Sequence, residues 1–447
     1  VKNCIFNNTV SKVEGNAIYI SQSNAITVEI SLCQFIDCGS DQKSYSIQVG
    51  SMNFDFIDNE VIFTDHSKSC CCVKSIGISK NRFIGNVFKN AHGDNTANSA
   101  GIDVQKLSGQ ASSIEIVNNT FDYFTGKADG LCFNANAGNA IDNLVIKSNN
   151  IQNCISSGVL THITLTPSME SFEISDFSFQ NNSFDDESLY NQIHLSLQVL
   201  VVFQNNDKSI VTFNDFNFTN NASPKQGGGF ISKGSEDNKN LMFTFNNCHF
   251  AGNKAKEEGS ALAIITTIDC FINNCKFINN KSNEKGGVIY IETKSTEILS
   301  PQVSITNCIF DSNQGENGGL NVNNSPTAQL SLLNNTFLDC GNNGYTVFVQ
   351  SEVESCSINQ CKIEFTNPNE CGGMSIKSKG NIEITNIEIL KTSLNTALLI
   401  HSEDTSSKIT VDHCIFDSCT GDSIACFDIS IHSTFFTFED NVIQNIN

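Results

Sequence analysis

The sequence predicts an all-β chain folded as a right-handed parallel β-helix, a solenoid of about sixteen coils of about 29 residues each. Three observations support this fold class. A short motif recurs along all 447 residues, three strand-like segments follow one another in each repeat, and no helical periodicity interrupts them. Because each repeat of a solenoid buries its apolar face only against its neighbours, residues 1–447 can form a single domain despite their number.

The recurring motif has the frame Asn-Cys-x-Phe-x-x-Asn and is clearest at residues 247–253, 274–280 and 307–313. The aromatic or aliphatic residue at its fourth position is taken as the anchor of one coil. Coils of a parallel β-helix stack about 4.8 Å apart, so each anchor should pack on its counterparts in the neighbouring coils. The predicted anchors are Phe6, Phe35, Phe56, Phe83, Phe121, Ile151, Phe184, Phe218, Phe250, Phe277, Phe310, Phe337, Ile363, Ile389, Phe416 and Ile443.

Two further strand-like segments complete each repeat. A glycine-rich turn and a run of alternating apolar residues follow the anchor, as at 286–291 and 318–322. Another period-two run precedes the next anchor, as at 303–306 and 409–412. Three short strands joined by polar turns describe one coil of a parallel β-helix.

Two slots of the repeat alternate between asparagine and cysteine. Stacked Asn side chains can pass a hydrogen bond from amide to carbonyl along the axis, and Asn tolerates the left-handed backbone of a sharp corner. The slot two residues before the anchor holds Asn81, Asn119, Asn149, Asn182, Asn335 and Asn441, or Cys4, Cys33, Cys248, Cys275, Cys308, Cys361 and Cys414. The slot three residues after it holds Asn59, Asn86, Asn221, Asn253, Asn280 and Asn313, or Cys38, Cys154, Cys340 and Cys419.

These motifs resemble the polymorphic outer membrane protein (Pmp) family of chlamydial surfaces and its relatives on unicellular eukaryotes, which carry repeated F-x-x-N and G-G-A-[ILV] motifs. Residues 250–253 and 277–280 match the first motif, and residues 286–289 match the second loosely. In that family the β-helix is a surface-displayed passenger involved in adhesion. The resemblance therefore implies a non-enzymatic extracellular or cell-surface scaffold that contacts other extracellular proteins, glycans or copies of itself.

Charge and cysteine content restrict the partners and the compartment. Twenty-six Lys and Arg against 47 Asp and Glu give a net charge of −21, which repels phosphate backbones, so no nucleic acid partner is expected. No apolar run is long enough to cross a membrane, so this segment is not expected to insert directly. Nineteen cysteines favour an oxidising, extracellular setting, because cytosolic thiols stay reduced.

Candidate disulfide cysteines occur in pairs five residues apart. Vertical pairs between neighbouring coils, such as Cys248/Cys275, are also at bridging distance, and the sequence does not choose between the two arrangements. The candidate pairs are Cys33/Cys38, Cys270/Cys275, Cys356/Cys361 and Cys414/Cys419.

Candidate N-glycosylation sites follow the Asn-x-Ser/Thr rule. In so Asn-rich a chain about this many arise by chance, so they support glycosylation only in a secretory compartment. The sequons begin at Asn7, Asn118, Asn181, Asn217, Asn221, Asn280, Asn323 and Asn334.

A carbohydrate-active enzyme of the pectin-lyase-like class, a polysaccharide hydrolase or lyase, is the alternative function. Such an enzyme needs carboxylates on adjacent coils, often with Arg or Lys as the base. The single arginine, Arg82, argues against an Arg-based lyase, and carboxylates without further geometry more often lie in turns. The candidates are Asp185-Asp186-Glu187 and Glu257-Glu258, with Asp55 and Asp58 more remote.

No catalytic, cofactor-binding or metal-ligating residue is assigned from the sequence. The run Cys70-Cys71-Cys72 is interpreted as structural, because three adjacent side chains cannot converge on a tetrahedral metal as C-x-x-C pairs do. Repeat motifs begin at Asn3 and end at Asn445, with no room for capping elements. Since natural solenoids close their ends, we expect an interior fragment of a longer protein.

Overall fold

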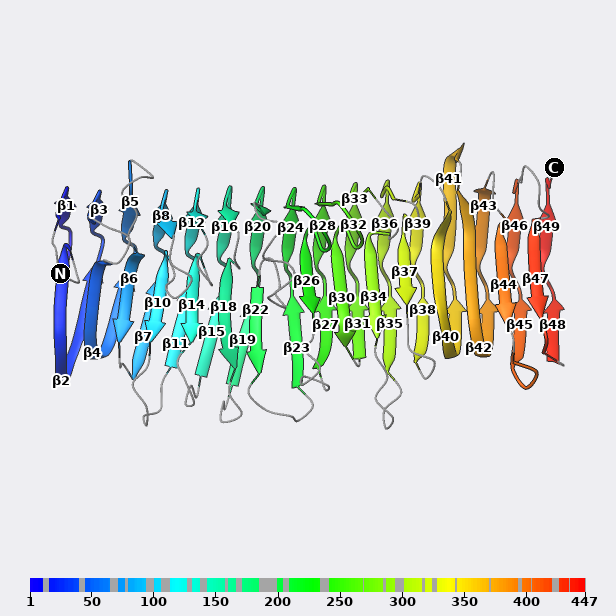
Figure 1. Ribbon diagram of the computed structural model, residues 1–447, viewed down its shortest axis with the longest axis horizontal. Helices are drawn as coiled ribbons and strands as arrows, with labels where there is room; N and C mark the ends of the chain where they lie inside the picture. The colour runs from blue at the N-terminus through cyan, green and yellow to red at the C-terminus, as the bar shows by residue number, and fades with distance from the viewer. Residues whose placement is uncertain are drawn as a thin grey trace. The chain divides into compact units, whose positions relative to one another are not determined.

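The computed structural model describes residues 1–10, 16–39, 45–64, 71–76, 79–93, 100–105, 113–126, 131–136, 143–156, 160–165, 171–184, 199–203, 209–233, 241–267, 269–283, 287–293, 301–315, 318–323, 328–341, 344–369, 371–392, 396–402, 404–419, 426–433 and 435–446. The chain forms two compact units, Val1–Asn205 and Asn206–Asn447. Within the described part of each unit the strands pair in parallel between successive coils, which confirms the predicted parallel β-helix (Figure 1). No helix among these residues is long and apolar enough to cross a membrane.

A column of short strands carries the anchors. In the first unit it comprises β1 (Ile5–Asn7), β3 (Gln34–Ile36), β5 (Glu60–Ile62), β8 (Val87–Lys89), β12 (Thr120–Asp122), β16 (Asn150–Gln152) and β20 (Ser178–Gln180). In the second unit it comprises β24 (Asn217–Thr219), β28 (His249–Ala251), β32 (Lys276–Ile278), β36 (Ile309–Asp311), β39 (Thr336–Leu338), β41 (Lys362–Asn369), β43 (Glu388–Thr392), β46 (Ile415–Asp417) and β49 (Val442–Gln444).

The other two strand segments of each coil form two further columns in each unit. In the first unit these are β2 (Ile18–Ser31), β4 (Tyr45–Ile57), β6 (Cys71–Ile76), β7 (Lys80–Ile84), β10 (Ile102–Gln105), β11 (Ser113–Val117), β14 (Phe133–Asn136), β15 (Asn143–Lys147), β18 (Thr161–Leu165), β19 (Ser171–Ser175) and β22 (Val199–Phe203).

In the second unit the same columns comprise β23 (Ser209–Asn214), β26 (Phe230–Lys233), β27 (Leu241–Asn246), β30 (Leu262–Thr267), β31 (Asp269–Asn273), β34 (Ile289–Thr293), β35 (Gln302–Thr306), β37 (Leu320–Asn323), β38 (Gln329–Leu333), β40 (Tyr345–Asn359), β42 (Gly372–Thr385), β44 (Leu398–Ser402), β45 (Lys408–Asp412), β47 (Phe427–Ile431) and β48 (Phe435–Glu439).

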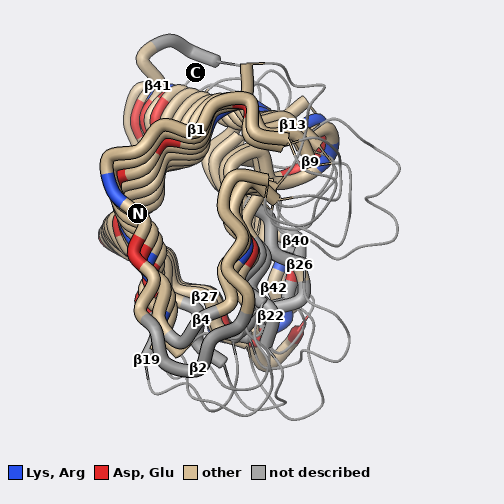
Figure 2. The backbone as a smooth tube through the Cα atoms, turned by 90° about the vertical axis from the view of Figure 1, so that its left-hand side faces the viewer, with Lys and Arg blue, Asp and Glu red and all other residues tan. Residues whose placement is uncertain are grey.

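Two-residue strands follow the short strands in some coils and form a minor column in each unit. In the first unit the anchor strand β1 and the minor strands β9 and β13 mark neighbouring sides of the coil (Figure 2). These strands are β9 (His92–Gly93), β13 (Thr125–Gly126), β17 (Ile155–Ser156) and β21 (Ser183–Phe184) in the first unit, and β25 (Ala222–Ser223), β29 (Lys254–Ala255) and β33 (Lys281–Ser282) in the second.

Most predicted anchors stack in register. Phe250 pairs with Phe277 and Phe277 with Phe310, and the rings of each pair lie parallel with centroids 5.0 and 4.8 Å apart. The anchor points into a fully buried core, while the residues on either side of it face outwards. This alternation is the period-two pattern of a strand with one buried face.

Two predicted anchors of the first unit are wrong. Phe56 and Phe83 pair with each other in β4 and β7, and the residues in the anchor column are Val61 and Phe88. All four residues are buried. In each coil the predicted anchor is the phenylalanine of the strand before the corner, and the true anchor lies five residues further on. An apolar side chain alone does not show whether its residue belongs to the strand before the corner or to the strand after it.

The same error displaced the predicted anchor Phe184. That residue lies in the minor strand β21, and Phe179 of β20 stacks on Ile151 in the anchor column. With the anchors corrected, Asn59 and Asn86 precede the anchor, and Asn182 follows it.

Asn81 is also reassigned. It lies in β7 opposite Phe54 and Ile114, where it is buried and its Oδ1 accepts a hydrogen bond from the Ser75 hydroxyl. It therefore belongs to the wall of the sheet and not to a corner column.

The predicted asparagine and cysteine columns are buried ladders at two corners. At the corner before the anchors, the backbone N–H of Asn86 donates to Oδ1 of Asn119 at 3.0 Å, and its Nδ2 donates to the carbonyl of Phe56 at 2.8 Å. Cysteine continues the ladder through N–H to sulfur contacts, such as Cys248 N to Cys275 Sγ at 3.4 Å. The ladder runs through Cys4, Cys33, Asn59, Asn86, Asn119 and Asn149, and in the second unit through Cys248, Cys275, Cys308 and Asn335.

The second ladder lies after the anchors. Its best-formed part is in the second unit, where Asn221, Asn253, Asn280 and Asn313 are fully buried. The backbone N–H of each of the first three donates to the Oδ1 of the next at 2.9 to 3.0 Å. Side-chain amides thus satisfy backbone groups that a sharp corner leaves without a strand partner.

The left-handed backbone occurs beside the ladder and not within it. Asn118 has φ 56° and Asn247 has φ 55°, and each directly precedes a ladder residue. The prediction that the ladder asparagines themselves take this conformation is therefore wrong, because the residue directly before each ladder position takes it.

Candidate functional site

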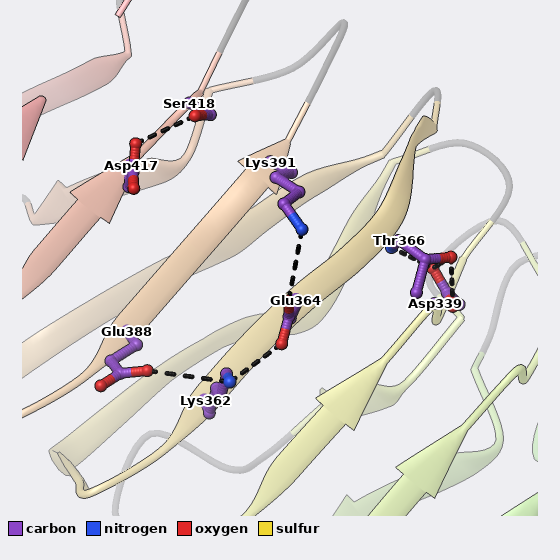
Figure 3. Close-up of polar contacts among 8 residues, drawn as sticks. All are labelled: Asp339, Lys362, Glu364, Thr366, Glu388, Lys391, Asp417 and Ser418. Atoms are coloured by element: carbon purple, nitrogen blue, oxygen red, sulfur yellow. Dashed lines mark hydrogen bonds and ion pairs between the residues drawn. The ribbon is translucent and has the colours of Figure 1, made fainter. Parts of the chain in front are cut away.

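The outer side of β41 and β43 carries a cluster of opposite charges, here called the paired-charge face and defined by Lys362, Glu364, Glu388 and Lys391 (Figure 3). Its position follows from the strand pattern. Ile363, between Lys362 and Glu364, is buried as an anchor, so both charged neighbours must face outwards.

The four charges form a continuous network across two coils. Lys362 Nζ lies 2.9 Å from Glu364 Oε2 and 4.0 Å from Glu388 Oε2, and Lys391 Nζ lies 3.4 Å from Glu364 Oε1. The side chains remain a quarter to a half exposed, so the network is accessible to a partner.

The pKa shifts on this face favour the charged forms. The hydrogen bond from Lys362, reinforced by Lys391, lowers the pKa of Glu364, and the hydrogen bond to Glu364 raises the pKa of Lys362. A general acid or base works best with a pKa near the operating pH. Shifts in these directions make Glu364 and Lys362 fixed charges and not proton-transfer groups.

The Asp339 carboxylate connects its own coil to the next coil by hydrogen bonds. Asp339 accepts hydrogen bonds from the backbone N–H and the hydroxyl of Thr366, with Oδ1 2.7 Å from the nitrogen and Oδ2 2.9 Å from Oγ1 (Figure 3). The first unit repeats this contact between Asp37 and Thr64 at 2.7 and 2.6 Å. Sequence reasoning missed the pair, although each Asp stands in a Phe-x-Asp-Cys motif and each Thr follows it by 27 residues.

Asp417 continues the polar surface beyond β43. Its carboxylate accepts a hydrogen bond from Ser418 Oγ at 2.9 Å (Figure 3). It also accepts from Gln444 Nε2 at 3.0 Å and from Asn445 Nδ2 at 2.8 Å. These hydrogen bonds lower the pKa of the Asp417 carboxyl, and the bond from Asn445 has the largest effect.

The first unit contains a second polar group, here called the covered polar column and defined by Gln48, Lys74, Asp103 and Asn134. The register stacks these residues on β4, β6, β10 and β14. Asp103 is fully buried, and its Oδ2 lies 3.5 Å from the Tyr45 hydroxyl, which can donate to it. Sequence reasoning missed this column because Asp103 occupies an ordinary outward position between Ile102 and Val104.

Tyr45 connects the column to a cation. Lys74 Nζ lies 4.5 Å from the centroid of the Tyr45 ring, within cation–π range. A carboxylate, a lysine and a phenol thus lie on adjacent coils, and each is a type of side chain that can act in general acid–base catalysis.

The predicted carboxylates do not gather into one site in the described residues. Asp55 lies 3.5 Å from Arg82 Nη1, and Glu115 lies 3.2 Å from Arg82 Nε, so Asp55 takes part in an ion-pair column. Asp58 is exposed in a turn with φ 53°.

The remaining predicted carboxylates serve local structure or lie outside the described residues. The backbone N–H of Glu257 donates to the carbonyl of Lys225, and the Glu258 carboxylate accepts from Gln226 Nε2 at 2.6 Å. The segment Asp185-Asp186-Glu187 lies outside the described residues.

An exposed histidine stands between two carboxylates in the second unit. Asp412 Oδ2 lies 2.7 Å from His413 Nδ1, and Asp440 Oδ2 lies 3.9 Å from Nε2. One ligand atom from each of the three residues lies within 4.8 Å of the others, a spacing that a metal ion could use. The Asp412 hydrogen bond raises the pKa of His413.

The structure places the predicted disulfide cysteines at different corners. Cys33 and Cys38 bracket β3, and Cys414 and Cys419 bracket β46, so an extended strand separates the members of each pair. Bridged Cα atoms lie within about 7 Å, which favours vertical neighbours over these pairs.

The other two predicted pairs show the same separation. Cys270 and Cys356 lie within β31 and β40, whereas Cys275 and Cys361 lie beyond the ends of these strands. Disulfide formation itself stays a prediction.

Sequon asparagines divide by burial. Asn7, Asn118, Asn181 and Asn334 are exposed, whereas Asn221 and Asn280 are ladder residues with no exposed surface. A glycan on either ladder residue is incompatible with the ladder. Asn217 is half-buried, and the side chain of Asn323 lies outside the described part.

Comparisons with known proteins give a distant likeness to a solved structure. No family model matches the chain, and no curated protein matches it. Among solved structures, a mutant of the alginate lyase AlyGC, of the PL6 family, covers 94% of this chain and 97% of its own at 9% identity, with a TM-score of 0.24. At that identity and TM-score, no conclusion about activity rests on the likeness.

Proposed function

We propose that the chain is a non-enzymatic extracellular or cell-surface scaffold, which makes structural or adhesive contacts with other extracellular proteins, glycans or copies of itself. The paired-charge face carries this proposal. Its charges are partly exposed and mutually paired, and the pKa shifts of Lys362 and Glu364 favour their charged forms. Such a surface can recognise a partner by charge pattern while offering no group suited to proton transfer at neutral pH.

Three features of the chain support display outside the cell. The repeat motifs resemble those of surface-displayed Pmp passengers. Nineteen cysteines suit an oxidising compartment, and several sequon asparagines, among them Asn118 and Asn334, are exposed.

A binding measurement tests the proposal. The immobilised full chain is probed with an array of neutral glycans, with extracellular matrix proteins and with the soluble chain itself. We expect capture of at least one of these probes, and Glu364→Lys should weaken it about tenfold, which corresponds to about 1.4 kcal/mol.

Glu173→Lys is the matched control. Glu173, like Glu364, is hydrogen-bonded to a lysine, in this case Lys147 at 2.9 Å, but it lies in β19 of the first unit. Equal weakening by both variants, or no capture of any probe, would count against a contact role for the paired-charge face.

A polysaccharide hydrolase or lyase is the second candidate function, and the covered polar column favours it. Asp103, Lys74 and Tyr45 lie on adjacent coils, where three side chains capable of acid–base chemistry come together in the first unit. A depolymerisation screen with polyuronates and neutral polysaccharides tests this candidate. Turnover that Asp103→Asn abolishes and Asp55→Asn retains would replace the scaffold proposal with an enzymatic one.

A further inference from the structure

The outer side of β27, β31, β35 and β38 in the second unit carries a polar surface, here called the hydroxyl–amide face (Figure 1). Phe245, Ile272 and Ile305 point inwards from these strands and are fully buried, so the residues on either side of them face outwards. The register stacks the outward residues in rows from coil to coil. Six partly exposed residues define the face, namely Thr244, Asn246, Phe271, Asn273, Ser304 and Ser331.

The face has almost no charge, although the whole chain has a net charge of −21. The described outward positions of the four strands hold one charged residue, Asp269. Asp269 is only 5% exposed, and its Oδ1 accepts the backbone N–H of Gln302 at 2.9 Å. A charged partner would gain no ion pair on this surface, so charge complementarity favours a neutral partner.

Phe271 places an aromatic side chain in the middle of a row of hydroxyl residues. In the register it pairs with Thr244 on one side and with Ser304 on the other, and Ser331 follows Ser304 in the same row. The electron-rich face of an aromatic ring attracts the polarised C–H groups of a sugar ring. Serine and threonine hydroxyls both donate and accept hydrogen bonds, which suits the hydroxyls of a sugar.

The amide row beside the hydroxyls is held in a fixed orientation. Asn246 Nδ2 donates to Asn214 Oδ1 at 2.9 Å, and Asn273 Nδ2 donates to Asn246 Oδ1 at 3.0 Å. An amide has two N–H donors and an oxygen with two lone pairs, so Asn246 keeps one N–H and one lone pair for a partner. Groups that are already oriented lose little conformational freedom on binding.

We propose that the hydroxyl–amide face binds a neutral polysaccharide whose chain lies along the coil axis. The coils repeat the hydroxyl and amide groups about every 4.8 Å, and an extended polysaccharide also presents its hydroxyls at a regular interval. A protein partner fits less well, since protein–protein interfaces are depleted in serine, which recurs in this row. The proposal rests on the scaffold role, for which it names one class of partner, but not on the paired-charge face.

Insoluble cellulose, chitin, β-1,3-glucan and mannan are the probes for the test. The full chain is mixed with each of them, and the protein left in solution gives the affinity. We expect binding to at least one probe. Phe271→Ala should weaken it about tenfold, because the stacking ring is lost, and Ser304→Ala about threefold, because one hydrogen bond is lost. Circular dichroism melting shows that each variant is folded.

Phe348→Ala is the matched control. Phe348 also faces outwards in the second unit, between the buried Val347 and Val349, but it lies in the other strand column, opposite Asn321. Its loss should leave polysaccharide binding unchanged. Equal weakening by Phe271→Ala and Phe348→Ala would contradict the proposal, as would a chain that binds none of the four probes.

Glu364→Lys separates this surface from the paired-charge face. Polysaccharide binding that Glu364→Lys weakens and Phe271→Ala leaves intact would overturn the proposal and assign the glycan to the paired-charge face. Capture of a polyuronate or a protein in place of the neutral probes, lost in Phe271→Ala, would show that the face has a different class of partner and would also overturn it.

Discussion

At the scale of single residues, the corners depend on asparagine side chains that act as backbone substitutes. Asn253 Oδ1 accepts the backbone N–H of Asn221 at 3.0 Å, and its Nδ2 donates to the carbonyl of Phe218 at 2.8 Å and to Asn280 Oδ1 at 2.9 Å. The amide therefore satisfies three buried groups from the two neighbouring coils. Removing it leaves each of them without that partner in a core closed to water.

Replacing Asn253 with Ala should lower the free energy of unfolding by about 2–4 kcal/mol, since buried polar groups lose their partners. Urea denaturation followed by circular dichroism measures the change. Asn217→Ala is the control, because Asn217 faces outwards in the preceding coil and its loss should cost at most about 0.5 kcal/mol. Equal losses in the two variants would contradict the role assigned to the ladder.

The exposed residue His413 should make stability depend on pH. Asp412 raises the pKa of His413 in the folded chain, so His413 binds a proton more tightly in the folded chain than in the unfolded chain. The stabilisation is complete below the unfolded pKa of about 6.5 and is lost as pH rises through the folded pKa. NMR titration should give a pKa above that ordinary value.

Unfolding measurements on His413→Gln provide the check. The stability difference between wild type and variant should shrink as pH rises through the folded pKa of His413. A difference that does not change with pH would show that the Asp412 contact does not persist in solution.

At the scale of elements, the anchor strands are held by aromatic stacking. Phe277 lies between Phe250 and Phe310, and Phe310 stacks in turn on Phe337 with centroids 4.5 Å apart. Offset stacking of this kind adds to the free energy gained by burying the rings. Each three-residue strand therefore contributes more to stability than its backbone hydrogen bonds alone.

Truncating Phe277 to Ala should destabilise the second unit by about 3–5 kcal/mol, because Phe250 and Phe310 cannot move together to fill the cavity that the lost ring leaves. Differential scanning calorimetry would record the fall in melting temperature. Lys276→Ala, an exposed change in the same strand, should change stability by at most about 0.5 kcal/mol. A small effect of Phe277→Ala would mean that the neighbouring coils collapse to fill the space.

At the scale of the whole molecule, every coil contacts chiefly its two neighbours, so stability is distributed along each unit. Cysteines are distributed in the same way, and most described ones are buried in the ladders or the core. Their sulfur atoms accept hydrogen bonds from backbone N–H groups, as Cys308 Sγ does from the N–H of Cys275. Free thiols therefore already satisfy the backbone N–H groups at the corner.

If the chain is displayed outside the cell, several of its nineteen cysteines should nonetheless be bridged in the native protein. Each bridge closes a loop and contributes about 2–4 kcal/mol. Alkylation of the unreduced protein followed by mass spectrometry counts the free thiols. Nineteen free thiols would remove the main argument for an oxidising compartment.

The sequence by itself determined the fold class, because stacking puts the same side chain in the same slot of every coil. The frame around Phe250, Phe277 and Phe310 and its Asn partners was enough to predict parallel strands and buried ladders. It failed where a coil has apolar side chains on both sides of the corner, as with Phe56 and Val61.

Only the tertiary structure decided which residues meet between coils. The connections vary in length, so Asn59 contacts a residue 27 positions away, whereas Asn86 contacts one 33 positions away. A shift of one residue turns a side chain to the opposite face of the sheet. The contacts of Lys362 with Glu388 and of Asp103 with Tyr45 therefore depend on a register that loop lengths set and that no local pattern records.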